Sequence, residues 1–191
     1  MRFLIHFVLA TVIALAVGFG LSYFALSDGR LFGALRVGPW AAWPAVGGNA
    51  PDPYTRAYLA RNGALQLGQS EGLQFIATSD SDGKPLDRRC QYKIDGTTPV
   101  ASFWTLAATN PDGVNIARPG APTSIHSARI ARANDGSIVV YAAKTLSPQN
   151  WLEITGDGPF SLVLTLYDTA VLSGFTGGVD VLPAVLREAC S

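Results

Sequence analysis

Apolar positions follow three different patterns along the chain. Residues 3–27 form a run of 25 without any Asp, Glu, Lys or Arg. Residues 31–51 show neither a helical nor an alternating period, and are dense in Gly, Pro and Ala. Beyond them, short alternating runs are separated by turn residues. The patterns therefore predict an N-terminal apolar helix, a linker and a β-rich domain, over residues 1–30, 31–51 and 52–191.

The apolar run is long enough to cross a membrane. As a helix it would measure ~37 Å, and a bilayer core is ~30 Å thick. We therefore expect a single-pass signal-anchor that uses residues 3–27 and leaves the rest of the chain outside the cytoplasm. A cleaved secretory signal is the alternative, because Ala25-Leu26-Ser27 resembles a cleavage site. The apolar core of a signal peptide is shorter, however, at ~7 to 15 residues.

The linker contains two tryptophans, Trp40 and Trp43. An indole is half apolar and half polar, so the two side chains suit the interface between membrane and water. They suit equally well a position packed against the domain that follows. The sequence leaves both interpretations open.

A short helix is expected to open the domain. Asp52 can cap it, and Pro53 suits the first helical position because its missing N–H needs no partner there. Within "YTRAYLARNGALQLG", apolar residues including Tyr54, Tyr58 and Leu65 recur at near-helical spacing.

Strands and tight turns follow the helix. The runs "LQFIATS", "RRCQYKI", "ASFWTLAA", "SARIARA" and "SIVVYAA" adjoin turns that contain Asp-Gly, and such turns predict hairpins because glycine accepts a positive φ. In "NWLEITGDGPFSLVLTLYDT", residues 150–169, the apolar positions 160, 162, 164 and 166 predict a strand with one face on the core. Asn150-Trp151 is expected to form a corner before it. Many short strands of this kind indicate a mainly β fold, namely a jelly-roll-like β-sandwich.

Three segments in this order, "DPYTRAYLARNGALQLGQSEGLQF", "RRCQYKIDGTTPVASFWTL" and "NWLEITGDGPFSLVLTLYDT", resemble the family called domain of unknown function 1214 over roughly residues 52–190. In particular, the chain resembles the short bacterial form with an N-terminal hydrophobic segment. The resemblance implies a jelly-roll-like domain at the cell envelope. Together with the N-terminal apolar run, it leads us to expect a chain anchored in the bacterial inner membrane with its soluble domain in the periplasm. It also implies a companion protein of the domain of unknown function 1254 family. It supplies no catalytic residue, and after Trp151 this chain has Leu152-Glu153 where the family often has Leu-Pro.

Charge and ligand-forming residues exclude several classes of function. Lys and Arg number 14, as do Asp and Glu, and no basic run offers the positive stripe that nucleic acids need. One histidine outside the apolar run and two distant cysteines do not supply a zinc site. Aspartates in the turns and Glu153 could gather around calcium, but Asp in a turn usually bonds its own backbone. We expect no metal and no cofactor.

Cys90 and Cys190 are the only cysteines. An even pair in an oxidising compartment predicts a disulfide, here between an early strand and the C-terminal tail. Two buried free thiols are the alternative.

Two hypotheses for function remain. The first is a non-catalytic, membrane-tethered domain with a binding or structural role, whose contacts to a protein partner or an envelope glycan involve Trp104, Trp151, Asn150 and His126. The second is an extracytoplasmic hydrolase, in which His126 is the base and a serine hydroxyl, such as Ser70 in "GQSEG", is the nucleophile. That motif lies between a helix and a strand in the reverse of the usual order for a nucleophile elbow. The first hypothesis is preferred because it needs no unusual geometry.

Overall fold

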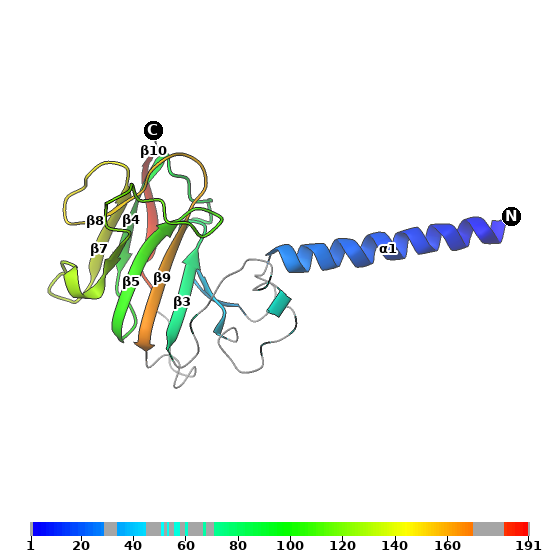
Figure 1. Cartoon of the computed structure of the whole chain (residues 1–191), viewed down its shortest axis with the longest axis horizontal. Coiled ribbons are helices and arrows are strands. Elements are labelled where there is room, and N and C mark those ends of the chain that lie inside the picture. The colour runs from blue at the N-terminus through cyan, green and yellow to red at the C-terminus, as the bar shows by residue number, and fades with distance from the viewer. Residues whose placement is uncertain are drawn as a thin grey trace.

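A computed structural model describes residues 2–28, 34–44, 51, 53, 56, 57, 60, 67, 71–169 and 182–190. Its globular part consists of two β-sheets that pack face to face, and an N-terminal helix extends away from them (Figure 1). The mainly β fold and the N-terminal helix are therefore confirmed. The jelly-roll form of the sandwich stays a prediction.

One sheet has six strands and the other has four. The larger sheet has the order β1-β2-β3-β9-β5-β6, and the smaller has the order β10-β4-β7-β8. Every strand pair is antiparallel except β7 with β8, which is parallel. The strands are β1 Leu35–Val37, β2 Trp40–Ala42, β3 Gly72–Ala77, β4 Cys90–Gly96, β5 Ala101–Thr109, β6 Ser124–His126, β7 Ile138–Ala143, β8 Asn150–Glu153, β9 Ser161–Thr169 and β10 Ala184–Cys190; a 3-10 turn, η2, spans Ser127–Arg129.

The core lies between the two sheets and follows the alternation of side chains along each strand. The apolar face predicted for β9 is confirmed, because Phe160, Leu162, Leu164 and Leu166 are all at most 2% exposed. From the opposite sheet, Tyr92 packs its ring edge-on to Phe160, with the ring centroids 5.5 Å apart. Burial of such large apolar side chains supplies the main driving force for folding.

Helix α1, Arg2–Asp28, contains the apolar run. Its segment Arg2–Tyr23 is long and apolar enough to cross a bilayer, with a mean hydropathy of 2.4, and none of it is buried inside the protein. A signal sequence near the N-terminus would meet the same criteria. Its large apolar side chains, such as Phe3 and Phe19, are exposed, as expected of a helix whose partner is lipid.

Part of the expected linker lies in the larger sheet. Strands β1 and β2 form a hairpin, and β2 pairs with β3. Trp40 is 1% exposed, and its indole N–H donates to the carbonyl of Pro183 at 2.7 Å. Trp40 therefore packs onto the domain and does not lie at a membrane interface. Trp43 is buried as well. The prediction of a linker missed these two strands, because three residues are too few to show an alternating pattern.

The expected opening helix is described at four positions, Pro53, Arg56, Ala57 and Ala60, and all four are helical. Tyr54, Tyr58 and Leu65 lie outside the described residues, as does Asp52. The domain boundary at residue 52 stays a prediction.

Three of the predicted Asp-Gly turns form, and each is closed by little pairing of its own. The turn predicted at Asp95-Gly96 is wrong, because both residues belong to β4 and pair with β7. In the turns that contain Gly83, Gly113 and Gly136, the glycine has a φ of 80 to 83° and its N–H donates to the residue three positions earlier. Each turn is closed by a single bridge pair: Ser79 with Pro85, Thr109 with Asn115, and Arg132 with Ile138. The strands on either side of the Gly83 turn, β3 and β4, lie in different sheets, whereas β5 and β6, on either side of the Gly113 turn, pair with each other. The prediction that "SARIARA" forms a strand is wrong, since η2 occupies its start.

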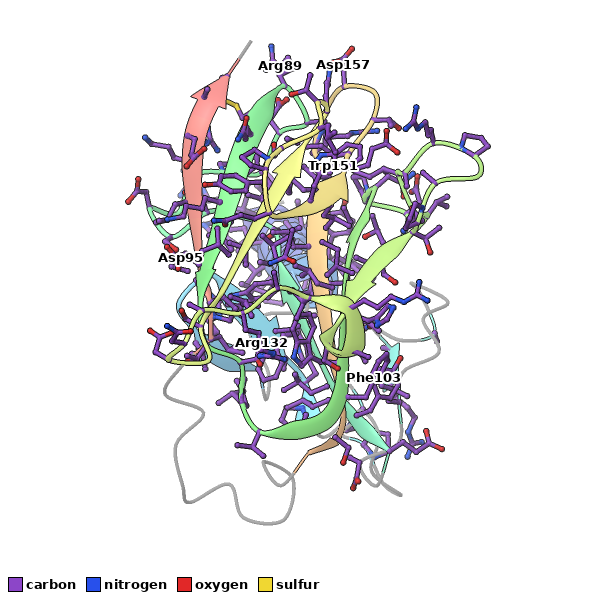
Figure 2. The ribbon with its side chains drawn as sticks, turned by 90° about the vertical axis from the view of Figure 1, so that its left-hand side faces the viewer. Arg89, Asp95, Phe103, Arg132, Trp151 and Asp157 are labelled. Atoms are coloured by element: carbon purple, nitrogen blue, oxygen red, sulfur yellow. A yellow bond between two sulfur atoms is a disulfide. The ribbon has the colours of Figure 1, made fainter. Side chains whose placement is uncertain are left out.

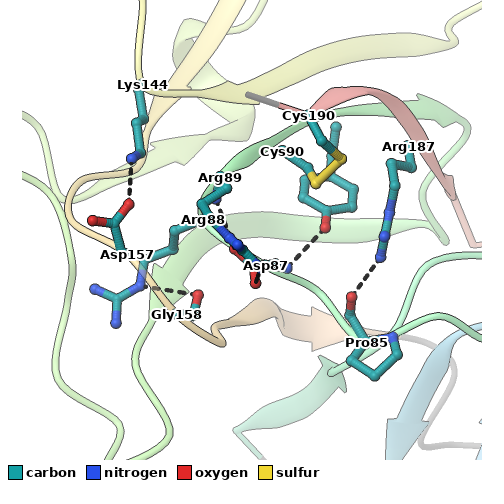
Figure 3. Close-up of polar contacts among 11 residues, drawn as sticks. Pro85, Asp87, Arg88, Arg89, Cys90, Lys144, Asp157, Gly158, Arg187 and Cys190 are labelled. Carbon is teal, nitrogen blue, oxygen red and sulfur yellow. Dashed lines mark hydrogen bonds and ion pairs between the residues drawn. A yellow bond between two sulfur atoms is a disulfide. The ribbon is translucent and has the colours of Figure 1, made fainter.

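The C-terminal strand β10 is fastened to β4 by covalent and polar contacts (Figure 3). The predicted Cys90–Cys190 disulfide is present. Nearby, Arg187 forms an ion pair with the buried Asp80 at 3.0 Å and lies over the ring of Tyr92. These contacts hold β10 in place as an edge strand of the smaller sheet.

Candidate functional site

A pocket lies beside β8, the edge strand of the smaller sheet. It has a volume of about 440 Å³, which falls in the range of small-molecule sites. Strand β8 contributes Trp151 and Glu153, and the loop 118–122 contributes Arg118, Pro119, Gly120, Ala121 and Pro122. The corner predicted at Asn150-Trp151 is thus wrong, because these residues begin a strand parallel to β7.

Strand alternation places Trp151 and Glu153 on the outward face of β8. Leu152, between them, belongs to the core, so its neighbours on the strand point the other way. The indole N–H of Trp151 donates to the carbonyl of Ala143 at 3.0 Å, and the ring is half-buried. Its N–H is therefore satisfied within the protein, and the ring is held in one orientation. Figure 2 shows Trp151 in the half of the sandwich that carries Arg89 and Asp157, away from Phe103 and Arg132.

Glu153 is a buried carboxylate at the pocket, with only 8% of its side chain exposed. One oxygen, Oε1, lies 3.1 Å from Nε of Arg118, whose side chain is 67% exposed. The other oxygen, Oε2, is buried and has no hydrogen-bond partner among the residues that the structure describes. A buried carboxylate oxygen without a donor is unfavourable, and it is a feature that needs an explanation in a native site.

The loop opposite β8 is held by backbone contacts. The N–H of Ala121 donates to the carbonyl of Arg118 at 3.1 Å, and the N–H of Thr155 donates to the carbonyl of Ile116 at 3.1 Å. The second contact ties the start of the loop to the chain just after β8. Pro119 and Pro122 restrict the backbone between them. The pocket is therefore bounded by a tethered loop on one side and a strand on the other.

Trp104 and Asn150 do not line the pocket and contact other parts of the protein. Trp104 is 2% exposed in the core, and the guanidinium of Arg132 lies 5.8 Å from its ring centroid. Asn150 uses its amide to accept from the N–H of Ala131 and to donate to the carbonyls of Ala131 and Val139. Of the predicted contact residues, Trp151 alone lines the pocket.

His126 lies in β6, at the edge of the larger sheet, opposite Thr105. Its ring centroid is 5.6 Å from that of Phe103, and its buried Nδ1 has no hydrogen-bond partner within the described ranges. In the described part of the chain no hydrogen bond joins His126 to a serine or a carboxylate. Ser70 lies outside the described residues, so the predicted nucleophile cannot be placed beside it. The neighbouring Gly72 is in β3, where a Cβ would collide with the backbone carbonyl of Leu166.

The acidic turn residues bind their own turns or nearby cations. Asp80 accepts from the N–H groups of Asp82 and Lys84, Asp87 pairs with Arg89, and Asp157 pairs with Lys144. Within the described ranges, no three His, Cys, Asp or Glu side chains gather as a metal site would require. The calcium alternative therefore gains no support from these turns.

Several of these turns contain aspartates with shifted pKa values. The side-chain hydrogen bond from Arg89 lowers the pKa of Asp87 to about 2. A hydrogen bond from Lys144 likewise lowers the pKa of Asp157, and one from Ser137 lowers that of Asp135. Each shift stabilises an ionised carboxylate in a turn.

The sequence did not indicate that Arg118 and the loop 118–122 are part of a site. The signal available was "RPGAP" at residues 118–122, a rigid and turn-forming stretch with one cation. No local pattern connects it with Trp151 or Glu153, which lie 33 and 35 positions after Arg118. Only the fold brings the loop and β8 together.

Comparison with known proteins gives a family and a fold. The model of a family described as "Protein of unknown function (DUF1214)" matches residues 71–171. No curated protein matches the chain. Among solved structures, the VPA0106 protein from Vibrio parahaemolyticus is similar with a TM-score of 0.58 and 19% identity, over 74% of this chain and 36% of that one. An uncharacterized protein from Burkholderia cenocepacia has a TM-score of 0.44 and 17% identity, over 78% of this chain and 46% of that one. The chain thus spans less than half the length of either protein.

Proposed function

The chain belongs to the DUF1214 family of proteins of unknown function, and from this premise we propose that it is a non-catalytic binding domain. In this proposal α1 anchors the chain in the bacterial inner membrane, and the sandwich lies in the periplasm. There it binds a glycan of the cell envelope in the pocket formed by Arg118, Trp151 and Glu153. The companion protein of the domain of unknown function 1254 family stays a prediction from the resemblance.

The observation that carries the proposal is the pocket beside β8. A half-buried indole, fixed by its bond to Ala143, adjoins a buried carboxylate with an unused acceptor. A flat aromatic surface with a few polar groups is the usual composition of a small-ligand site. A sugar ring suits such a site, because it presents C–H groups on its faces and hydroxyls at its edges.

The location is supported by two features. Segment Arg2–Tyr23 has the length and hydropathy of a membrane span. The Cys90–Cys190 disulfide is consistent with a compartment outside the cytoplasm, since structural disulfides persist where the environment is oxidising.

A sedimentation assay tests the proposed function. The full chain, purified in detergent, is mixed with isolated peptidoglycan sacculi and centrifuged, and we expect it to pellet with them. Trp151→Ala should abolish pelleting, whereas Phe103→Ala, which removes a partly exposed aromatic ring from the larger sheet, should not. Failure of the unaltered chain to pellet contradicts glycan binding, and release of soluble sugar during the incubation contradicts the non-catalytic role.

A further inference from the structure

We propose that the ligand unit recognised in this pocket is an uncharged sugar ring, which stacks on Trp151 and places neighbouring hydroxyls on Arg118 and Glu153. This inference rests on the proposed function and names the class of glycan that the same site takes. Its basis is the charge balance of the pocket, the unpaired oxygen of Glu153 and the walls of the site.

The charge balance favours a neutral ligand. Among the described residues that line the pocket, Arg118 and Glu153 are the charged ones, and they form an ion pair with each other. A ligand carboxylate would be attracted by Arg118 but repelled by Glu153. A ligand ammonium group would be attracted by Glu153 but repelled by Arg118. An uncharged hydroxyl avoids both repulsions, and it can donate to the carboxylate and accept from the guanidinium.

The unpaired oxygen of Glu153 calls for a donor. Oε1 has Arg118 as its partner, while Oε2 is buried without one. A hydroxyl that donates to Oε2 would remove the cost of leaving this oxygen unsatisfied, and hydrogen bonds to charged groups are stronger than those between neutral groups.

Arg118 controls access to that oxygen. Oε2 has almost no open surface, so a neighbouring side chain has to move before a ligand hydroxyl can reach it. Arg118 pairs with the same carboxylate, and in this inference it is the side chain that moves. The Arg118 side chain is 67% exposed and has open solvent to move into. Because Glu153 is buried, its carboxylate needs a replacement partner when Arg118 moves, and the ligand hydroxyl supplies one. The guanidinium contacts Glu153 through Nε, so its terminal N–H groups stay available to donate to an adjacent hydroxyl or ring oxygen.

The walls of the pocket match the faces of a sugar ring. The indole of Trp151 offers a flat apolar surface, and Pro119 and Pro122 border the pocket from the loop. The C–H face of a pyranose can pack on the indole while its hydroxyl edge points toward Arg118 and Glu153. Aromatic side chains contribute large contact areas at low entropic cost.

Calorimetric titration with a panel of oligosaccharides tests the inference. The probes are tetramers of glucose and of N-acetylglucosamine, which are neutral, of glucosamine, which is cationic, and of galacturonic acid, which is anionic. The full chain is kept in a detergent without a sugar headgroup, because a maltoside would compete. We expect a neutral tetramer to bind, with an affinity that changes less than about twofold between about 50 and 500 mM salt, since screening acts on charged partners.

Variants separate the roles of the three side chains. Trp151→Ala and Glu153→Gln should each lower the affinity about tenfold or more, as expected for a stacking anchor and a charged acceptor. Trp151→Phe should retain most of the binding, because it keeps a flat ring. Phe103→Ala and Glu188→Gln are the matched controls outside the pocket. Circular dichroism and thermal melting show whether each variant is folded, and Trp151→Ala tests the site independently if Glu153→Gln does not fold.

Each outcome is decisive. Binding of a neutral tetramer that is lost in Trp151→Ala supports the inference. Binding of the anionic or cationic tetramer alone overturns it but leaves a glycan-binding function in place. If no tetramer binds while sacculi still pellet the chain, the inference fails alone. If sacculi fail too, the proposed function falls with it.

Discussion

At the scale of single residues, Leu164 and Trp151 differ in burial although they lie close together in the sequence. Leu164 is 1% exposed in the centre of the core, whereas Trp151 is half-buried at the pocket. We expect Leu164→Ala to lower the free energy of unfolding by about 2 to 5 kcal/mol, because it leaves a cavity. Trp151→Ala should cost only about 1 kcal/mol, since its loss is mainly one hydrogen bond and partial contact area.

Urea denaturation of the two variants measures this difference. Ser161→Ala, a substitution on the outer face of the same strand, is the control for a change of side chain in β9. If Trp151→Ala unfolds the domain as readily as Leu164→Ala does, the indole is part of the core and its role as a ligand contact is doubtful.

The ion pair between Asp87 and Arg89 makes a second prediction at this scale. The hydrogen bond from Arg89 lowers the pKa of Asp87 from 3.8 to about 2 in the folded protein. A carboxyl whose pKa is lower in the folded state stabilises the fold above its unfolded pKa and loses that contribution as the pH falls. Stability should therefore decline between about pH 4 and pH 2, and Asp87→Asn should flatten this part of the profile.

Denaturant midpoints recorded across this pH range give the measurement. Asp82→Asn, in a neighbouring turn, controls for the loss of one carboxylate. An Asp87→Asn profile that is parallel to that of the unaltered protein down to pH 2 would show that the pair with Arg89 contributes nothing.

At the scale of elements, β10 depends on contacts far from it in sequence. Its disulfide joins residues separated by 100 positions, and Arg187 connects it to Asp80 and Tyr92. Closure of so long a loop stabilises by about 4 to 5 kcal/mol in the chain-entropy model. Cys190→Ser should therefore lower the free energy of unfolding by up to about this amount, and the substituted side chain is exposed, so no packing is lost.

Chemical denaturation with and without a reductant checks this expectation. The unaltered protein should shift toward the stability of Cys190→Ser when it is reduced, and the variant should not respond. Labelling with a thiol reagent in non-reducing denaturant should modify neither cysteine of the unaltered protein. Two labelled cysteines would mean that the bridge does not form in the cell.

At the scale of the whole molecule, the arrangement of α1 and the sandwich predicts a tethered protein. Helix α1 carries its apolar side chains exposed, while the apolar faces of the sheets are buried in their own core. We expect the chain to remain in the membrane pellet after alkaline extraction, because an apolar helix that spans a bilayer resists such treatment. N-terminal sequencing of the pellet should begin near Met1. A soluble chain that begins near Asp28 would show that the segment is a cleaved signal.

The sequence by itself determined the features that depend on local patterning. A run of 25 residues without acidic or basic side chains predicted α1, and the alternation in residues 160–166 predicted which face of β9 is buried. Asp-Gly pairs predicted the tight turns at Gly83, Gly113 and Gly136, because only a few residues accept a positive φ at little cost. The disulfide was predicted because the chain has two cysteines and was expected to lie in an oxidising compartment. Three segments with a family resemblance indicated the sandwich.

Tertiary structure alone decided which strands pair and which residues share a site. Alternation specifies the face of a strand but not its neighbour, so a turn of the hairpin type can be followed by a strand of the opposite sheet, as after Gly83. Trp40 joined the core through Pro183, which lies 143 positions away, and Trp104 proved to be buried. Arg118 met Glu153 because a loop and an edge strand converge. Such long-range contacts leave no local pattern, since each partner is compatible with many positions in the fold.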